Sequence, residues 1–466
     1  MTLDHKWSPG VQNYVKHANE YLARRNEYIQ KVVKKWKFDT IAVHGLYSVQ
    51  DAIEDYQGAI IEPVFMCTSQ AYRDSDEMEA ALAYLIPTWC YSRIANPSTY
   101  YFEWTLALLE GYGFDGFTSC CSTSSGMAAI MTAIQPFLIH GLTHHPQNIV
   151  ATAQCYGGTF QHFNIRLHQE RGIECRWVLD PTNIEEWASK IDKHTCLLYG
   201  ELPSNPGLGF FDIKLVADLA HSHGVPLIVD STVATPALLR PICHGADVVV
   251  QSATKSLTAG GFGTCGAVIS RGDIVTQMGT DQMRKDFALY IKYLPNRDYG
   301  PNLHPMQAIM TLNDMRTIRS KMDLLSRNTM CVANFLKEHS KIEQVNYLGL
   351  PDHPLFSLAS KYMWLVDSEF DDMYKRPINR YGHLLSFCVK GGVEKTRKTF
   401  DKLQRIWRAT DLGRIKSVAT IPAISTHQQQ GDAGRKLANI PQNLIRLCVG
   451  AEHPEDIISD LDQALS

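Results

Sequence analysis

The chain has 466 residues, of which 45% are hydrophobic and 20% are charged. Its 45 basic and 48 acidic residues leave a formal net charge of -3, which argues against a strongly basic nucleic-acid binder and against a highly charged disordered chain. At roughly 150 residues per domain, the length allows about three domains, or fewer and larger ones with a sizeable core.

The 12 cysteines are predicted to be reduced and mostly buried. No apolar segment follows the charged residues at the N-terminus, so we expect no secretory signal. The chain has no Cys-x-x-Cys pair and no run of about 18 apolar residues, which argues against a zinc or thioredoxin-like site and against a membrane helix. We therefore expect a cytoplasmic protein with no membrane and no nucleic-acid partner.

Residues 11–37 are predicted to form an amphipathic helix, because apolar residues recur at spacings of three and four. Its basic face, with Arg24, Arg25 and Lys31, is interpreted as a solvated face rather than a partner contact. The apolar side is expected to pack on the body of the protein or on a second subunit. Residues 1–78 together are predicted to be an N-terminal helical arm and extension.

From about residue 118 onwards, short β-branched runs alternate with amphipathic stretches. Strands are predicted at 148–152, 195–199, 226–230 and 247–251, and helices at 183–193 and 213–223. This alternation predicts an α/β fold whose mostly parallel central sheet is covered on both faces. In such a sheet, functional groups lie just beyond the carboxyl ends of the strands. The large domain is predicted to span residues 79–315.

The pattern changes after about residue 315. A helical stretch at roughly 305–340 leads into alternating runs at 384–389 and 444–449. We predict a smaller α/β C-terminal domain over residues 316–466. The polar and aromatic segment 363–381 is interpreted as an inserted surface loop.

Three short patterns point to other chemistries and are disfavoured by their context. Residues 261–266 match the G-x-G-x-x-G of dinucleotide sites, but they enter a predicted strand rather than a helix. Residues 252–255 match the S-x-x-K of penicillin-interacting serine enzymes, without the S-D-N and K-T-G that accompany it. The pairs His221/His223 and His144/His145 lack further ligands at metal-binding spacing, so no metal is predicted.

A stronger signal comes from two neighbouring strand ends. Asp230 directly follows one apolar run, and Lys255 lies just beyond the next. A lysine amine condenses with the aldehyde of pyridoxal phosphate, and a buried aspartate keeps the pyridine nitrogen protonated so that the ring withdraws electrons. A plain Asp–Lys ion pair is the alternative interpretation of these two residues alone.

Three other strand ends carry suitable groups. Ser125 and Gly126 open an apolar helix, whose N-terminal N–H groups favour a phosphate; an ordinary helix cap is the alternative. Tyr156 precedes two glycines and is able to lay its ring over a planar cofactor. Asn205 follows the strand near residue 198 and is placed to reach the ring oxygen. The sequence therefore favours a pyridoxal phosphate site.

With these residues, the chain resembles the Cys/Met-metabolism enzymes of pyridoxal phosphate fold type I, the cystathionine γ-synthase-like group. The resemblance runs from about Phe38 to Ser466. The motifs that carry it are Phe38-Asp39-Thr40, Tyr91-Ser92-Arg93-Ile94-Ala95-Asn96-Pro97, Ser125-Gly126-Met127, Tyr156-Gly157-Gly158-Thr159, Pro203-Ser204-Asn205-Pro206, Val229-Asp230-Ser231-Thr232, Ser252-Ala253-Thr254-Lys255, Gly349-Leu350-Pro351-Asp352-His353-Pro354, Thr426-His427-Gln428-Gln429 and Ile445-Arg446-Leu447-Cys448-Val449-Gly450.

The resemblance implies a role for each matching residue. Lys255 would form the Schiff base and then move protons between Cα, Cβ and C4′, Asp230 would pair with the pyridine nitrogen, and Tyr156 would stack on the ring and assist the leaving group. The phosphate would be held by Gly126, Met127, Ser252 and Thr254, and the rest of the cofactor would contact Asn205 and Thr232. The phosphate of a neighbouring subunit would be reached by Tyr91 and Arg93. The substrate would be bound by Arg446, Ser417 and Asn205. The shared sites imply a homo-oligomer, in this family usually a tetramer built from dimers.

Two positions bear on the reaction. Methionine γ-lyases carry Cys at the third place of the Tyr-Gly-x-Thr motif, where this chain has Gly158. Lys416 before Ser417 is similar to the O-acetylhomoserine sulfhydrylases, and a basic group near the site would suit a small anion such as hydrosulfide. We therefore expect γ-replacement on an O-acylhomoserine by sulfide or a thiol. The alternatives are γ- or β-elimination from methionine, cystathionine or a related amino acid, and a non-catalytic homologue.

Overall fold

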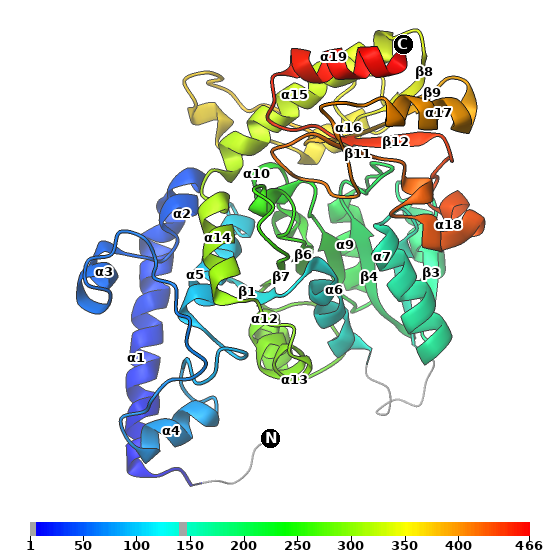
Figure 1. The fold of residues 1–466 in the computed structure, drawn as a ribbon. Coiled ribbons are helices and arrows are strands. Elements are labelled where there is room, and N and C mark those ends of the chain that lie inside the picture. The colour runs from blue at the N-terminus through cyan, green and yellow to red at the C-terminus, as the bar shows by residue number, and fades with distance from the viewer. Residues whose placement is uncertain (1–5, 139–146) are drawn as a thin grey trace.

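The computed structural model describes residues 6–138 and 147–466. Its elements form two sheets with helices around them, and an N-terminal group of helices lies along one side of the larger sheet (Figure 1). Among the described residues, none of the helices combines the length and the apolar character that crossing a bilayer demands.

The larger sheet has the order β1-β7-β6-β5-β4-β2-β3 within the described residues. Strands β2 to β6 run parallel, whereas β7 runs antiparallel to both of its neighbours. The prediction of an α/β fold with a mostly parallel central sheet is therefore confirmed. The strands are β1 Thr118–Thr123, β2 Asn148–Thr152, β3 Glu174–Val178, β4 Thr195–Glu201, β5 Leu227–Asp230, β6 Val248–Gln251 and β7 Gly266–Arg271.

The strands β2, β4, β5 and β6 are buried on both faces, which explains why they are mostly apolar runs rather than alternating ones. Leu198 and Val249 join the core under α5 and α9, whereas Leu197 and Val248 join a second core under α6 and α12. The helices around the sheet are α5 Pro97–Glu110, α6 Gly126–Ile134, α7 Gly157–Gln161, α8 Ile184–Lys190, α9 Ile213–Ser222, α10 Thr235–Leu238, α11 Asp281–Lys285, α12 Phe287–Ile291 and α13 Arg297–Tyr299.

The N-terminal helices are α1 Pro9–Lys31, α2 Phe38–His44, α3 Val49–Asp55 and α4 Ser75–Leu82. Helix α1 begins where predicted but ends at Lys31, and a short 3-10 turn follows it. Its basic face is not wholly solvated, which corrects the sequence interpretation. The Arg25 guanidinium lies 4.6 Å from the centre of the Trp104 ring on α5 and donates a hydrogen bond to the Tyr100 hydroxyl.

The smaller sheet has the order β10-β11-β12-β9-β8, with β10 and β11 parallel and the other pairs antiparallel. Helix α14 ends at Met315 and α15 begins at Ile318, and the domain division between residues 315 and 316 stays a prediction. The elements are α14 Pro305–Met315, α15 Ile318–Glu338, β8 Ile342–Asn346, α16 Phe356–Tyr362, β9 Leu384–Val389, α17 Gly392–Asp401, β10 Trp407–Arg408, β11 Val418–Thr420, α18 Gly431–Leu437, β12 Leu444–Cys448 and α19 Pro454–Leu465.

Segment 363–381 is a surface loop in part, as predicted: most of residues 369–377 are exposed, whereas the residues before them pack against the body of the protein. Leu365, Val366 and Ser368 are buried. The Asp367 carboxylate accepts hydrogen bonds from the Phe38 backbone N–H at 2.8 Å and from the Tyr112 hydroxyl at 2.9 Å. Asp367 therefore ties the segment to the N-terminal helices and to the end of α5.

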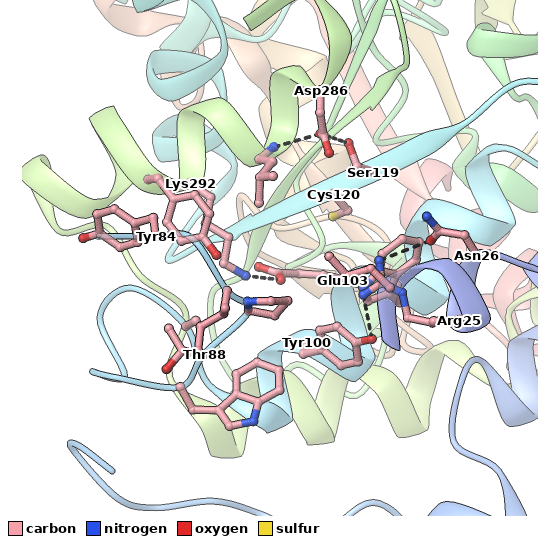
Figure 2. A pocket seen from close by; sticks show the side chains of 18 of the residues that line it. Arg25, Asn26, Tyr84, Thr88, Tyr100, Glu103, Ser119, Cys120, Asp286 and Lys292 are labelled. Atoms are coloured by element: carbon pink, nitrogen blue, oxygen red, sulfur yellow. Dashed lines mark hydrogen bonds and ion pairs between the residues drawn. The ribbon is translucent and has the colours of Figure 1, made fainter. Parts of the chain in front are cut away.

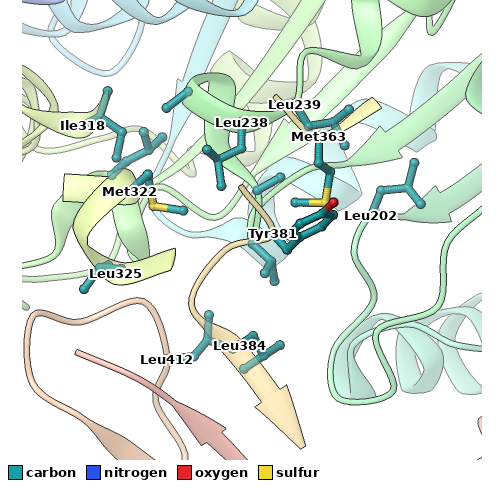
Figure 3. Packing of buried hydrophobic residues seen from close by; sticks show 14 of the residues in the cluster. Leu202, Leu238, Leu239, Ile318, Met322, Leu325, Met363, Tyr381, Leu384 and Leu412 are labelled. Atoms are coloured by element: carbon teal, nitrogen blue, oxygen red, sulfur yellow. The ribbon is translucent and has the colours of Figure 1, made fainter. Parts of the chain in front are cut away.

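One apolar cluster joins the two sheets (Figure 3). It brings Leu238 of α10, Met322 of α15 and Leu384 of β9 together, and it extends to Ile29 of α1. The cysteines agree with the prediction, because all 12 are free thiols and most of them are buried or half-buried. The two sheets are therefore held at a fixed separation by continuous packing.

The seam between the sheets provides a stability test. Met322→Ala truncates a fully buried side chain in this cluster and leaves a cavity, which we expect to cost about 2–5 kcal/mol. The matched control is Met373→Ala, whose side chain is 71% exposed. Urea unfolding followed by circular dichroism should show a clearly lower midpoint for Met322→Ala alone, and equal midpoints for the two variants would contradict the buried seam.

Candidate active site

A cavity of about 320 Å³ lies at the carboxyl ends of β4, β5 and β6, below the smaller sheet. Ten of the residues predicted from the sequence line it together. They are Gly126, Met127, Tyr156, Asn205, Asp230, Thr232, Ser252, Thr254, Lys255 and Arg446. Parallel strands explain the convergence, because their carboxyl ends meet at one edge of the sheet.

Asp230 is a buried carboxylate at the end of β5. It accepts hydrogen bonds from the Thr232 backbone N–H at 3.0 Å and from the Tyr199 hydroxyl at 3.5 Å. Burial raises the pKa of Asp230, and no basic side chain of the described residues forms an ion pair with it. A buried carboxylate of this kind is stabilised by a cation bound in the cavity.

Glu201 is a second buried carboxylate, and the sequence interpretation missed it. It stands directly opposite Asp230 in the pairing of β4 with β5. Its two oxygens accept the backbone N–H groups of Tyr156 and Asn205, each at 2.7 Å. Burial and the nearby charge of Asp230 raise the pKa of Glu201 well above its ordinary value. Glu201 therefore fixes the backbone of two cavity residues, and its place at a strand end was a usable signal.

The N-terminus of α6 forms one end of the cavity. The Ser125 hydroxyl accepts the Ala128 N–H at 3.2 Å, which caps the helix. A Cβ atom at Gly126 would lie 2.5 Å from the Ser252 Cβ, so only glycine allows the two backbones to approach this closely. The Thr254 hydroxyl bonds to the backbone of Cys265 through both its donor and its acceptor. Thr254 therefore holds the loop that carries Ser252 and Lys255.

Lys255 forms an ion pair that the sequence analysis did not anticipate. Its Nζ lies 2.8 Å from Asp411 Oδ1, and Asp411 Oδ2 lies 2.5 Å from Arg414 Nε. Burial raises the pKa of Asp411, but the pairs with Lys255 and Arg414 outweigh burial and leave it below its ordinary value. Asp411 lies in a loop without a recognised motif, so only the fold brings it to Lys255.

Arg446 is a buried cation in β12. Its guanidinium donates to Asn205 Oδ1 at 3.1 Å and to the backbone carbonyls of Thr410 and Asp411 at 3.0 and 2.6 Å. Burial lowers the pKa of Arg446 to about 10. No carboxylate of the described residues lies in salt-bridge contact with it, and its Nε has no hydrogen-bond partner. Arg446 is therefore suited to an anionic ligand.

Tyr156 is half-exposed at the edge of the cavity, directly before the two glycines that begin α7. A Cβ at Gly157 would lie 2.1 Å from the Thr426 carbonyl oxygen, and one at Gly158 would lie 2.5 Å from Tyr156 Cε1. Both glycines are therefore required for the turn as it stands. The Thr426-His427 motif lies beneath this turn, and burial lowers the pKa of His427 to about 4.

Two residues of the C-terminal segment that were expected at or near the site lie outside this cavity. Ser417 does not line the cavity; its hydroxyl donates to Glu452 at 3.0 Å and accepts the Gly450 N–H at 2.9 Å. Lys416 also lies outside the cavity, with its Nζ 5.0 Å from the ring centre of the exposed Trp407. Both residues precede β11, in a stretch where Ser417 lies against Glu452 and Lys416 against Trp407 rather than along the cavity.

Tyr91 and Arg93 also lie outside this cavity. Tyr91 is partly exposed, with the Arg93 guanidinium 5.4 Å from its ring centre, and Arg93 donates to the Arg297 carbonyl. Their predicted contact with the phosphate of a neighbouring subunit stays a prediction.

The alternative motifs do not form sites in the described residues. The segment 261–266 leads into β7 rather than a helix. His221 Nε2 lies 2.8 Å from Asp247 Oδ2, which makes it a structural partner of a buried aspartate. No group of three or more metal-type ligands is found in the described part of the chain, and His144 and His145 lie outside it.

A second cavity, of about 350 Å³, lies between α1, α5 and α12 (Figure 2). Lys292 Nζ lies 2.5 Å from Glu103 Oε2, whereas Asp286 and Arg25 bond to the hydroxyl groups of Ser119 and Tyr100. The main cavity differs because it combines a buried aspartate and a fully buried arginine with the lysine predicted from the sequence.

Comparisons with known proteins agree with this geometry. The family model for Cys/Met metabolism PLP-dependent enzymes matches residues 39–466. The chain is 32% identical to a homocysteine synthase from Schizosaccharomyces pombe, over 86% of this chain and 93% of that protein. It is 33% identical to an L-methionine gamma-lyase from Porphyromonas gingivalis, over 92% and 96%.

A solved structure is similar as well. It is a Campylobacter jejuni protein assigned as an O-acetylhomoserine (thiol)-lyase, crystallised with a pyridoxyl-lysine phosphate. The TM-score is 0.81 at 30% identity, covering 92% of this chain and all of that one. This likeness confirms the predicted fold.

The two hydrogen bonds of Glu201 can be tested with a matched pair of variants. Glu201→Gln replaces one acceptor oxygen by an amide group, which leaves a buried backbone N–H without an acceptor at a cost of about 1–3 kcal/mol. Glu186 also accepts two backbone N–H groups but is partly exposed, so water replaces the lost bond in Glu186→Gln. The urea midpoint should fall much further for Glu201→Gln, and equal falls would contradict the role of burial.

Proposed function

The chain belongs to the family of Cys/Met metabolism PLP-dependent enzymes, and from this premise we propose that it catalyses γ-replacement on an O-acylhomoserine by sulfide or a thiol. The observation that carries the proposal is the convergence of Asp230, Lys255 and Arg446 on one cavity. A volume of about 320 Å³ is in the range of small-molecule sites.

Pyridoxal 5'-phosphate is the cofactor of this family, and the residues present fit it. It supplies an aldehyde that condenses with amines and a protonated ring that withdraws electrons. The buried Asp230, which has no cationic partner among the described residues, would hold the ring nitrogen in its protonated form. The N–H groups at the start of α6, together with Ser252, suit the phosphate.

The other cavity residues act on the substrate. Arg446 binds the α-carboxylate through parallel hydrogen bonds, and the Asn205 amide oxygen holds the guanidinium in place. Lys255 Nζ removes the proton from Cα and then one from Cβ. The Tyr156 hydroxyl stabilises the group that leaves from Cγ. The thiol or sulfide then adds at Cγ, and Lys255 returns the protons.

Replacement and elimination share these first steps, so the choice between them rests on fewer observations. Gly158 stands where methionine γ-lyases carry cysteine, and a Cβ there would displace the Tyr156 ring. This favours replacement. Lys416, which also suggested replacement from the sequence, gives no support because it lies outside the cavity. Elimination from methionine, cystathionine or a related amino acid is the second candidate, favoured by the similarity to the methionine gamma-lyase.

The proposal includes assembly and location. We place the enzyme in the cytoplasm as a homotetramer built from dimers that share active sites. Tyr91 and Arg93 support this because they are accessible on their own subunit and lie outside its cavity.

The reaction is tested by product analysis of the purified enzyme. O-acetylhomoserine, O-succinylhomoserine, cystathionine and methionine are each incubated with and without sulfide. We expect homocysteine from a homoserine ester only when sulfide is present. Release of a keto acid from methionine or cystathionine without sulfide would support elimination instead.

Lys255 is tested separately from the choice of reaction. Lys255→Ala removes the amine that moves the protons, and we expect activity to fall at least about a thousandfold. Borohydride should attach the cofactor to residue 255 of the wild type, as read by peptide mass spectrometry, and not to the variant. The control is Lys361→Ala, which breaks a surface ion pair with Asp212 and should leave both measurements unchanged. A labelled lysine at another position would disprove the assignment.

A further inference from the structure

Asp411 connects the two cationic ends of the cavity. Its side chain lies 2.8 Å from Lys255 Nζ, and its backbone carbonyl lies 2.6 Å from Arg446 Nη2. An α-amino acid carries its ammonium and its carboxylate on the same carbon atom. A residue that spans Lys255 and Arg446 is therefore placed where both groups of a substrate must arrive.

The Asp411 carboxylate is held rigidly. Arg414 Nε lies 2.5 Å from its second oxygen, and Arg414 Nη1 donates to the backbone carbonyls of Thr254 and Thr258, each at 2.8 Å. These bonds tie the carboxylate to the loop that carries Lys255. Its first oxygen therefore keeps its position when the lysine side chain moves.

The partner of that first oxygen changes during the proposed reaction. When the Lys255 nitrogen is bonded to the cofactor, it is no longer a free ammonium, and Asp411 retains Arg414 and the Leu412 backbone N–H, which donates to Oδ1 at 2.9 Å. In the exchange, the substrate nitrogen forms a bond to the cofactor carbon and the bond from that carbon to the lysine nitrogen breaks. The incoming nitrogen must reach the same carbon, so it arrives close to the place of Nζ and to Asp411.

On the basis of the proposed function, we propose that Asp411 is a positioning residue that binds the α-ammonium of the incoming amino acid and then receives the ammonium of the released Lys255. The carboxylate thus holds whichever nitrogen is not bonded to the cofactor. Because Asp411 is partly buried, a charged hydrogen bond between its carboxylate and the substrate ammonium contributes strongly to the affinity of the site for an amine.

The test measures binding to the holoenzyme by isothermal titration calorimetry with two probes. L-norleucine carries the ammonium and the carboxylate but no leaving group at Cγ, and hexanoate lacks the ammonium. We expect the wild type to bind norleucine more tightly than hexanoate. In Asp411→Asn the affinity for norleucine should fall at least about tenfold, whereas the affinity for hexanoate should stay the same or rise.

Two control variants separate this role from a structural one. Arg414→Gln keeps the Asp411 carboxylate but removes the side chain that holds it, so the affinity for norleucine should fall by less than in Asp411→Asn and the affinity for hexanoate should not fall. Asp352→Asn breaks an exposed pair with Lys337 and should change neither affinity. If Asp411→Asn does not fold, Asp411→Ser is measured in the same way.

Each outcome decides the proposal. Equal losses for both probes in the Asp411 variant, no loss at all, or a wild type that does not prefer norleucine would overturn it. Neither probe reports on replacement or elimination. A lyase result in the product analysis would therefore leave the binding of the ammonium standing, and failure of the binding test would leave the reaction assignment standing.

Discussion

Two buried charges without charged partners determine how this molecule works. Asp230 lies at the end of a strand of the larger sheet, and Arg446 lies within a strand of the smaller one. Burying either charge costs free energy that a partner in the protein would normally offset. The proposed function assigns the complementary charges to the ligands, a protonated ring for Asp230 and a carboxylate for Arg446. In that proposal, ligand binding completes the electrostatics of the fold.

The rest of the structure keeps these charges in the right relation. Parallel strands β4 to β6 bring Glu201, Asp230 and the loop with Lys255 to one edge. The smaller sheet brings Arg446 from above, and the apolar seam in Figure 3 fixes the separation of the two sheets. Side chains such as Asn205 and Asp411 then bridge the two parts.

Features that depend on local pattern were predictable from the sequence. The strands, the cap of α6 and the positions of Asp230 and Lys255 all follow from apolar runs and from what ends them. Glu201 was within reach of the same reasoning. Asp411 was not, because it reaches Lys255 across a sequence separation of 156 residues and no motif marks it. Ser417 and Lys416 lie outside the cavity because the chain before β11 bonds to Glu452 and lies against Trp407, contacts that no local pattern announces. The packing of segment 363–381 depends on partners far along the chain.

The bond between Asp367 and the backbone of Phe38 spans 329 residues. A chain made from its N-terminus exposes α2 long before residue 367 leaves the ribosome. This bond therefore forms only after most of the protein has been made, whereas the contacts of Arg25 with Tyr100 and Trp104 on α5 are available much earlier in synthesis. The arm thus has an early partner in α5 and a late one in the segment around residue 367.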